Sequence, residues 1–191
     1  MSIKIADTKF PVIDLIKNRW SARSFSNKAM SENELNTILE AASWAFSANN
    51  MQPWHFIYAH QGETGFQKLV DCLMPGNQPW AKHAAVLIAA VIDTKTAAGT
   101  ENKAARHDIG AANATLMLQA QSMGIYGHVM GGVDIAKASS VLNIDTNVQE
   151  VVVFIALGYL DTAEKLEDPF KTRELTPRNR KPLSEFTKKL Q

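Results

Sequence analysis

The chain has 191 residues, of which 46% are hydrophobic and 20% are charged, and its formal net charge is +1. This composition is typical of a globular protein, and a charge so close to zero argues against a large nucleic-acid-binding surface. The single cysteine, Cys72, excludes an internal disulfide framework and is compatible with a reducing compartment. A chain of this length can bury a sizeable core, and we expect one domain over residues 1–191.

No stretch of the sequence predicts secretion or membrane insertion. Residues 1–5 lack the apolar core and the cleavage-like site of a signal peptide, so we expect none. The longest apolar run, residues 84–92, is far too short to span a bilayer. We therefore expect a cytoplasmic protein with no membrane partner.

Two helices are predicted near the start of the chain. Pro11 stands at the tolerated first turn of a helix over residues 11–17. Ser31 and Glu34 have the spacing of a capping box, which predicts a second helix that runs to about residue 45.

Between these helices lies a basic segment, Asn18-Arg19-Trp20-Ser21-Ala22-Arg23-Ser24. Its two arginines are four residues apart with a hydroxyl midway, and guanidinium groups fit the geometry of phosphate oxygens. Taken alone, these residues leave two interpretations open: a solvated basic loop and an anion-binding site.

The later elements follow from hydrophobic periodicity. Alternating aromatic residues and near-continuous apolar runs predict strands over residues 54–59, 84–92, 125–130 and 151–157. Helical spacing predicts helices over residues 66–73, 102–123 and 135–142, the last of them capped by Asp134. Residues 46–53 and 74–79 are predicted loops, and Gly124 is a predicted helix stop.

The last part of the chain, residues 161–191, differs in character. It is charged, contains three prolines and shows little periodicity, so it must be either disordered or held by another surface. Its apolar residues favour docking, with a partner subunit as the candidate surface. These residues are Phe170, Leu175, Leu183, Phe186 and Leu190.

Metal sites and catalytic dyads have little support. No two of the five histidines have the spacing of paired metal ligands, so no metal site is predicted. His107 and Asp108 resemble an acid–base pair, but neighbouring residues on a helix are expected to point in different directions. Cys72 lacks the signature of a nucleophile and is predicted to be a core thiol.

Two other features are compatible with a ligand site. Gly131-Gly132 follows a predicted strand, and paired glycines let a flat ligand approach the backbone. Arg178 and Arg180 in the tail are either a second basic wall or a solvated charge run. Neither the G-x-G-x-x-G nor the P-loop glycine motif is present.

Four separated pieces, taken together, resemble the FMN-dependent nitroreductase superfamily. They are Arg19-Trp20-Ser21-Ala22-Arg23, Ser47-Ala48-Asn49-Asn50-Met51-Gln52-Pro53-Trp54, Met130-Gly131-Gly132-Val133-Asp134 and Arg178-Asn179-Arg180-Lys181-Pro182-Leu183. Residues 108–112 and 122–125 also resemble the long central helix of that family and its end. The order and spacing of these pieces cover nearly the whole chain.

The resemblance implies an α+β fold with a mixed central sheet flanked by helices. It also implies an intertwined homodimer with FMN at the interface. Each C-terminal tail, from about residue 161, is then expected to extend across the partner subunit.

The resemblance also assigns FMN-binding roles to individual residues. Arg19 and Ser21 match ligands of the phosphate or ribityl chain, and Arg178 and Arg180 match the basic groups of the tail. Trp20 belongs to the same set, although it replaces a common arginine or histidine.

Further FMN-binding roles follow along the chain. Arg23 matches a cation that faces the pyrimidine side of the ring, where it stabilises negative charge on the reduced flavin. Gly131 and Gly132 match backbone near the flavin N5. The loop that reaches the flavin of the other subunit is matched by Ser47, Ala48, Asn50 and Gln52. Asn77 is a further candidate in an ambiguous region.

The implied activity is that of an FMN-dependent NAD(P)H oxidoreductase. NADH or NADPH reduces the flavin at N5, and a nitroaromatic, quinone or similar small conjugated oxidant then reoxidises it in a ping-pong cycle. The flavin carries the chemistry, so no protein residue is assigned as catalytic.

The chain departs from the family pattern at two further places. The segment over residues 61–105 is short, which leaves little room for the extra helices that cover the flavin in larger members, and Phe46 stands where many members have proline. Two alternatives stay open: a flavin-binding or sequestering dimer with little turnover, and a module for an unrelated phosphorylated ligand.

Overall fold

The computed structural model describes residues 2–190, so Met1 and Gln191, the ends of the predicted domain, lie outside the described part. Its helices are α1 (Asp14–Asn18), α2 (Glu32–Ser43), α3 (Thr64–Asp71), α4 (Gln78–Ala81), α5 (Ala105–Ser122), α6 (Ile135–Val141) and α7 (Phe170–Leu175). Its strands are β1 (Trp54–His60), β2 (Val86–Asp93), β3 (Tyr126–Met130) and β4 (Gln149–Gly158). Short 3-10 turns cover Ser2–Lys4, Ala48–Asn50, Ala163–Lys165 and Leu183–Glu185.

The four strands form one sheet in the order β1-β2-β4-β3. All three pairings are antiparallel. The α+β class is therefore confirmed, whereas the predicted mixed sheet is wrong for the described residues. The reason lies in the order of the strands. The crossover through α5 makes β2 and β3 parallel to each other, but β4 lies between them and is antiparallel to both.

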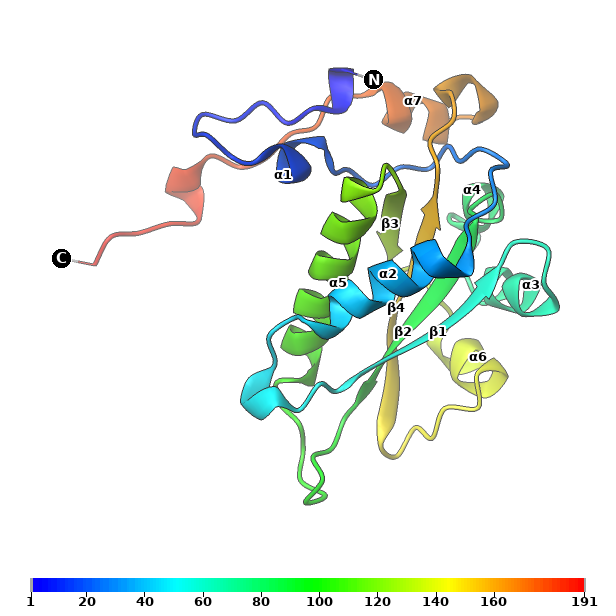
Figure 1. Ribbon diagram of the computed structural model, residues 1–191, viewed down its shortest axis with the longest axis vertical. Helices are drawn as coiled ribbons and strands as arrows, with labels where there is room; N and C mark the ends of the chain where they lie inside the picture. Colours follow the sequence, from blue (N-terminus) through cyan, green and yellow to red (C-terminus); the bar gives the residue numbers. More distant parts are fainter. Residues whose placement is uncertain (1, 191) are drawn as a thin grey trace.

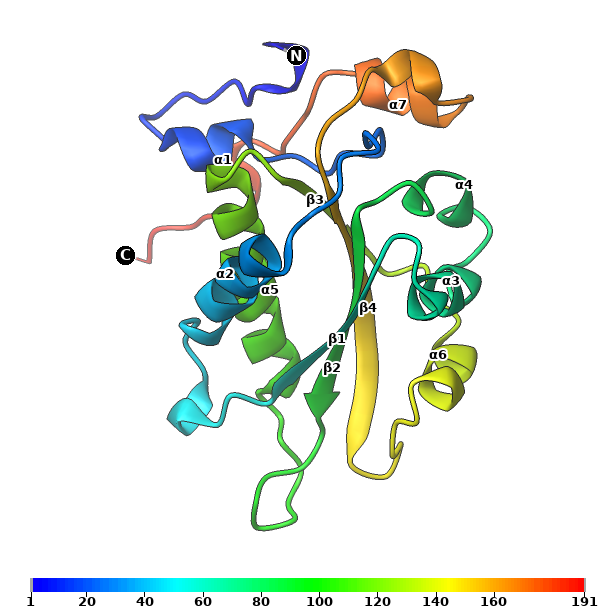
Figure 2. The same ribbon diagram turned by 45° about the vertical axis from the view of Figure 1, so that its right-hand side comes forward.

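Helices cover both faces of the sheet (Figure 2). On one face, α2 and α5 pack over a core that includes Leu35, Ile38 and Leu116. On the other face, α3, α4 and α6 enclose a second core around Trp80 and Phe154. Because it is covered on both faces, β2 is buried along nearly its whole length, as its apolar run predicts.

Several local signals predicted the elements correctly. Ser31 and Glu34 form the reciprocal capping box at the start of α2. Gly124 follows α5 with a φ of +70°, a conformation that glycine adopts without strain. Asp134 caps α6 by accepting a hydrogen bond from the backbone N–H of Lys137.

Two elements differ from the sequence predictions. Helix α1 begins at Asp14 rather than at Pro11, because Ile13 is still extended. Its apolar residues are not buried, and Leu15 and Ile16 are exposed. Residues 78–81, of which 78 and 79 belong to the predicted loop, form α4 with Pro79 in its first turn and Trp80 buried beneath the sheet.

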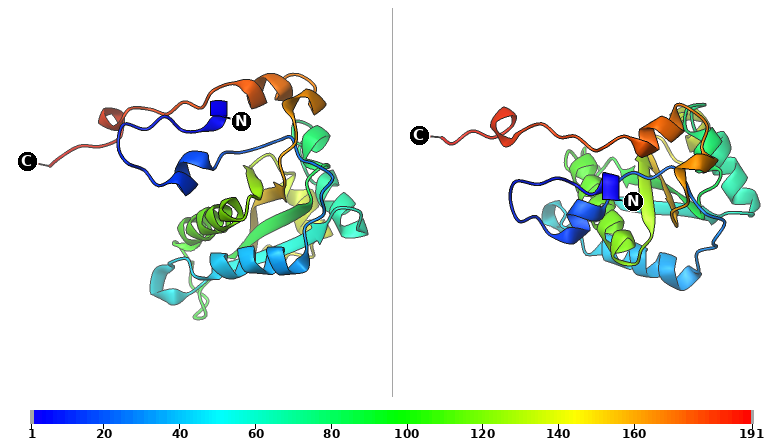
Figure 3. Two further views of the ribbon diagram at one scale, coloured as in Figure 1. Left: turned by 45° about the horizontal axis from the view of Figure 1, so that its top comes forward. Right: turned by 90° about the horizontal axis from the view of Figure 1, so that it is seen from above.

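The N-terminal segment and the C-terminal tail run side by side and extend away from the sheet (Figures 1 and 3). Both carry exposed apolar side chains, including Phe10, Ile13, Phe186 and Leu190. Solitary exposed apolar residues are common, but several on two adjacent extended segments indicate an interaction surface. No helix in the described part of the chain is both long and apolar enough to cross a bilayer.

Candidate functional site

The basic segment is extended and alternates between the core and the surface. Trp20, Ala22 and Ser24 are buried, whereas Ser21 is exposed and Arg19 is half-buried. The segment is held in place by the tail, because the Glu174 carboxylate accepts hydrogen bonds from the backbone N–H groups of Arg23 and Ser24 at 3.1 and 3.2 Å. Arg19 and Ser21 therefore present their polar groups outward from a fixed backbone.

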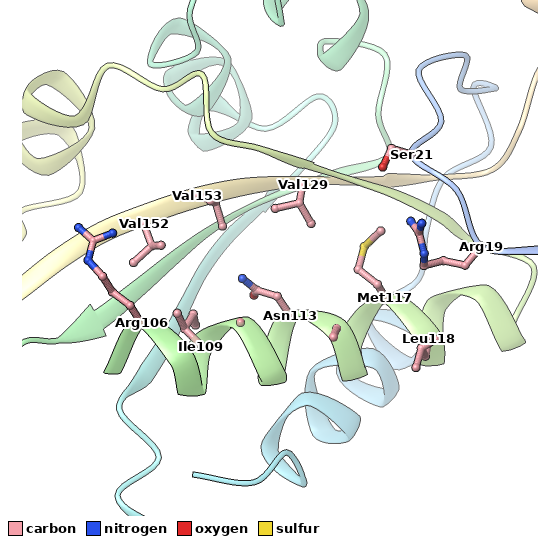
Figure 4. Close-up of a pocket in the computed structure, with 12 residues that line it drawn as sticks. Arg19, Ser21, Arg106, Ile109, Asn113, Met117, Leu118, Val129, Val152 and Val153 are labelled. Carbon is pink, nitrogen blue, oxygen red and sulfur yellow. The ribbon is translucent and has the colours of Figure 1, made fainter. Parts of the chain in front are cut away.

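These two side chains lie at one end of a cavity of about 500 Å³ between α5 and the strands (Figure 4). Arg106 lies at the other end, paired with Glu150. The walls between them are largely apolar and consist of Ile109, Gly110, Asn113, Ala114, Met117, Leu118, Val129, Val152 and Val153. Because β3 pairs only with residues 154–158 of β4, Val152 and Val153 lie beyond the end of β3 and are left to form the wall.

The Arg19 end of the cavity concentrates positive charge. Burial lowers the pKa of the Arg19 guanidinium, and the nearby charges of Arg178 and Arg180 lower it further. None of these three arginines has a carboxylate partner in residues 2–190. Cations held together without a counter-charge are expected to bind an anion, and phosphate is well suited to guanidinium donors.

Arg178 also joins the two ends of the chain. Its Nη1 donates to the backbone carbonyls of Lys4, Lys17 and Arg19 at 2.8–2.9 Å. It thereby fixes the tail against the N-terminal segment and forms a wall of a second cavity of about 820 Å³, on which Arg19 and Arg180 also lie. The predicted pair Arg178 and Arg180 is thus brought to Arg19, but Arg178 is engaged in holding the backbone.

Two other predicted residues do not line this cavity. The Trp20 ring is buried against Tyr126, with ring centroids 6.1 Å apart. The Arg23 guanidinium lies 5.8 Å from the ring centroid of Trp80. Neither side chain lines the cavity that Arg19 and Ser21 share.

The glycine pair is held by the loop before α4. The backbone carbonyl of Gly132 accepts hydrogen bonds from Met74 N and from Asn77 Nδ2. A Cβ at Gly132 would lie 2.8 Å from Asn77 Nδ2, so the close approach of that amide requires glycine. Gly131 is exposed, and a Cβ there would meet nothing within 4 Å. The exposed backbone at Gly131 is therefore open to a ligand.

The amide-rich loop lies at the other end of α5 from Arg19. Ala48 bonds to Asp108 near the start of α5, whereas Arg19 lies by Met117 and Leu118, roughly 14 Å further along the helix at 1.5 Å per residue. Ser47, Ala48, Asn50 and Gln52 are therefore not brought to Arg19 within one chain.

The loop is held in an unusual conformation. Asn49, Asn50 and Gln52 have φ values of 51°, 55° and 47°, in the left-handed region that non-glycine residues rarely adopt. Ser47 Oγ accepts a hydrogen bond from Gln52 N, and Gln52 Nε2 donates to Asn50 O. Clustered strained residues are common at ligand-binding sites, where the surrounding structure maintains them.

Asp108 connects this loop to α5. Its buried carboxylate accepts the Ala48 N–H at 3.1 Å, and its other oxygen lies 3.1 Å from Nδ1 of His107. The expectation that these neighbouring side chains point apart is therefore wrong, because the exposed His107 ring turns back toward the carboxylate. Asp108 is a positioning residue for the loop.

Replacing Asp108 with alanine is expected to lower the free energy of unfolding by about 1–3 kcal/mol, since the Ala48 N–H loses its acceptor. Amide hydrogen exchange across residues 46–53 should accelerate in the same variant. Asp108→Asn is the matched control, because its carbonyl oxygen can still accept that bond. Equal exchange in the wild type and Asp108→Ala would contradict this role.

Sequence reasoning missed the walls of the cavity. Arg106, Ile109, Asn113 and Met117 lie in α5, which was predicted as a helix without a ligand-binding face. The detectable signal was Asn113, an amide among small and apolar residues. Cys72 is a buried core thiol, as predicted, and burial raises its pKa.

Comparisons with known proteins identify the family of the chain. The model of the nitroreductase family matches residues 16–71 and 64–159. A protein of Archaeoglobus fulgidus, provisionally named an NADH dehydrogenase/NAD(P)H nitroreductase, is 32% identical over 154 residues, which cover 77% of this chain and 84% of that protein.

Solved structures share the fold. One described as an oxidoreductase containing FMN is 36% identical, has a TM-score of 0.89 and matches 95% of this chain and 92% of its own. A nitroreductase family protein from Streptococcus pneumoniae TIGR4, at 23% identity and a TM-score of 0.74, matches 92% and 98% of the two chains. The chain described here belongs to the nitroreductase family.

Proposed function

We propose that the protein is an FMN-dependent NAD(P)H oxidoreductase that reduces nitroaromatic, quinone or similar small conjugated oxidants. The observation that carries the proposal is the cavity along α5. At one end it has a hydroxyl group and a guanidinium group without a carboxylate partner among residues 2–190, and beyond them it has apolar walls. This arrangement matches an elongated ligand with an anionic end and a flat aromatic body. Similarity to an oxidoreductase that contains FMN supports the same ligand.

The residues present fit FMN. Arg19 and Ser21 would hold the phosphate end, and Arg180 would add positive charge near Arg19. The apolar walls of α5, β3 and β4 would exclude water from the ring. When bound, FMN supplies hydride acceptance and donation at its N5. Arg23 does not line this cavity, and its half-buried guanidinium lies 5.8 Å from the Trp80 ring centroid, so its assignment to the pyrimidine side of the ring stays a prediction from the resemblance.

We infer that two copies complete each site. The loop with Ser47, Ala48, Asn50 and Gln52 would reach the cavity of the partner, while the tail would cover the partner's surface. Exposed Trp44 and Phe46 beside this loop, at 84% and 69% exposure, support an interface there. The single domain over residues 1–191 and the cytoplasmic location remain predictions.

An absorbance spectrum of the purified protein tests the proposal directly. We expect a yellow dimer with flavin bands, or a colourless dimer that gains them when FMN is added. Anaerobic mixing with NADH or NADPH should bleach the flavin band, and an added quinone should restore it. Failure to take up FMN would refute the proposal. Tight FMN binding without bleaching by either nucleotide would instead support a flavin-sequestering dimer.

A further inference from the structure

Asn113 is a buried polar residue in the middle of the cavity wall. Its side chain is 8% exposed, and its Oδ1 has no hydrogen-bond partner in the part of the chain that the structure describes. Figure 4 shows the carboxamide pointing from α5 toward the strands that form the opposite wall. The residues one turn away on either side, Ile109 and Met117, are apolar.

A buried amide oxygen without a hydrogen-bond partner is costly to the protein alone. Most buried polar side chains in folded proteins have a partner, and an unsatisfied one destabilises the fold. An apolar residue would fit the surrounding wall better. The amide is therefore better explained by a partner that is not part of this chain.

The position of Asn113 indicates which part of a ligand it would meet. Arg19 and Ser21 lie opposite Met117 and Leu118, so Asn113 is roughly 6 Å further along the helix axis, at 1.5 Å per residue. That distance places it beyond the anionic end and alongside the body of the ligand. A carboxamide carries both a donor and an acceptor, which suits the alternating polar groups at the edge of a heteroaromatic ring.

We propose that Asn113 is a flavin-binding residue whose carboxamide hydrogen-bonds a polar group of the isoalloxazine ring. This inference rests on the proposed function, since it takes FMN as the ligand of the cavity. It adds a ring contact from the central helix to the residues that the sequence resemblance identifies. In the apoprotein the same side chain is a source of instability, because nothing in the described chain donates a hydrogen bond to its Oδ1.

The test uses Asn113→Leu, which keeps the branched shape of the side chain and removes the amide. Thr115→Val is the matched control, because Thr115 is on the same helix, its hydroxyl donates to the Ala111 carbonyl, and it does not line the cavity. We expect Asn113→Leu to raise the Kd for FMN about tenfold, the loss expected when a buried ligand group loses its partner. Riboflavin should lose affinity by the same factor, since the contact is to the ring. Flavin fluorescence titration measures both.

Stability of the FMN-free protein provides the second measurement. Asn113→Leu should leave the Tm of the apoprotein unchanged or raise it, while the visible bands of bound flavin shift. Unchanged affinity for both flavins would overturn the inference, as would a loss confined to FMN. A fall in apoprotein Tm together with affinity would show a structural role and overturn it as well. If the wild type itself binds no FMN, the proposed function fails, and this inference fails with it for a distinguishable reason.

Discussion

Replacing Arg19 with alanine is expected to raise the Kd for FMN by about 100-fold. Removing one partner from a buried, charged hydrogen bond costs roughly 2–5 kcal/mol, and each 1.4 kcal/mol is a factor of ten in affinity. Arg19 is half-buried at the end of the cavity and has no carboxylate partner among the described residues, so its charge is available to the phosphate.

The same change should not harm the FMN-free protein. Burial and the charges of Arg178 and Arg180 all disfavour the protonated Arg19 guanidinium. Its removal relieves this repulsion, so the Tm of the apoprotein is expected to stay the same or to rise.

Two controls make the Arg19 result specific. Riboflavin lacks the phosphate, so its affinity should be nearly unaffected by Arg19→Ala. Arg106→Ala removes a guanidinium from the other end of the cavity, where Glu150 already neutralises it, and should change FMN affinity little. Equal losses for FMN and riboflavin in Arg19→Ala would show that Arg19 does not act on the phosphate.

Acid is expected to destabilise the protein through His128. This side chain is buried between Trp80, at 4.5 Å between ring centroids, and the Ala22 carbonyl, to which Nδ1–H donates at 3.0 Å. Burial and the nearby positive charge of Arg23 lower the pKa of His128 to about 4 from 6.5. The unfolded chain therefore binds a proton more readily than the folded protein between these pH values.

Folding stability is therefore expected to fall as the pH falls. Stability contributed by neutral His128 is complete above about pH 6.5 and is lost as the pH falls toward 4, by on the order of 3 kcal/mol. Urea unfolding of the wild type and His128→Gln at pH 7 and pH 5 measures the loss. The difference between the two proteins should fall by about 2 kcal/mol over that interval. A constant difference would show that His128 does not titrate in this way.

Glu174 gives stability the opposite dependence on pH, so its contribution must be distinguished from that of His128. Burial raises the pKa of its carboxyl, so its charged form is disfavoured in the folded protein. The stability associated with this group is present below its unfolded pKa and decreases as the pH rises through its folded value. Comparing wild type with His128→Gln at each pH cancels this contribution, because both proteins retain Glu174.

Local signals in the sequence predicted most of the elements. The capping box of Ser31 and Glu34 placed α2, and the apolar run near Val86 placed β2, because both patterns depend only on nearby residues. Helix α1 was placed three residues too early because Pro11 permits a helix start without requiring one. The direction of strand pairing was not local information, since it depends on β4 lying between β2 and β3.

The sequence by itself identified Arg19, Ser21 and the tail arginines as one basic site, through the order and spacing of the pieces shared with a family. The tertiary structure alone decided that Arg178 holds the backbone, that Trp20 faces the core and that Arg23 lies beside Trp80. It also decided that Asn113 points into the cavity. The physical reason is that the cavity wall combines α5, β3 and β4, whose side chains are brought together only by long-range packing and leave no periodic signal in any one segment.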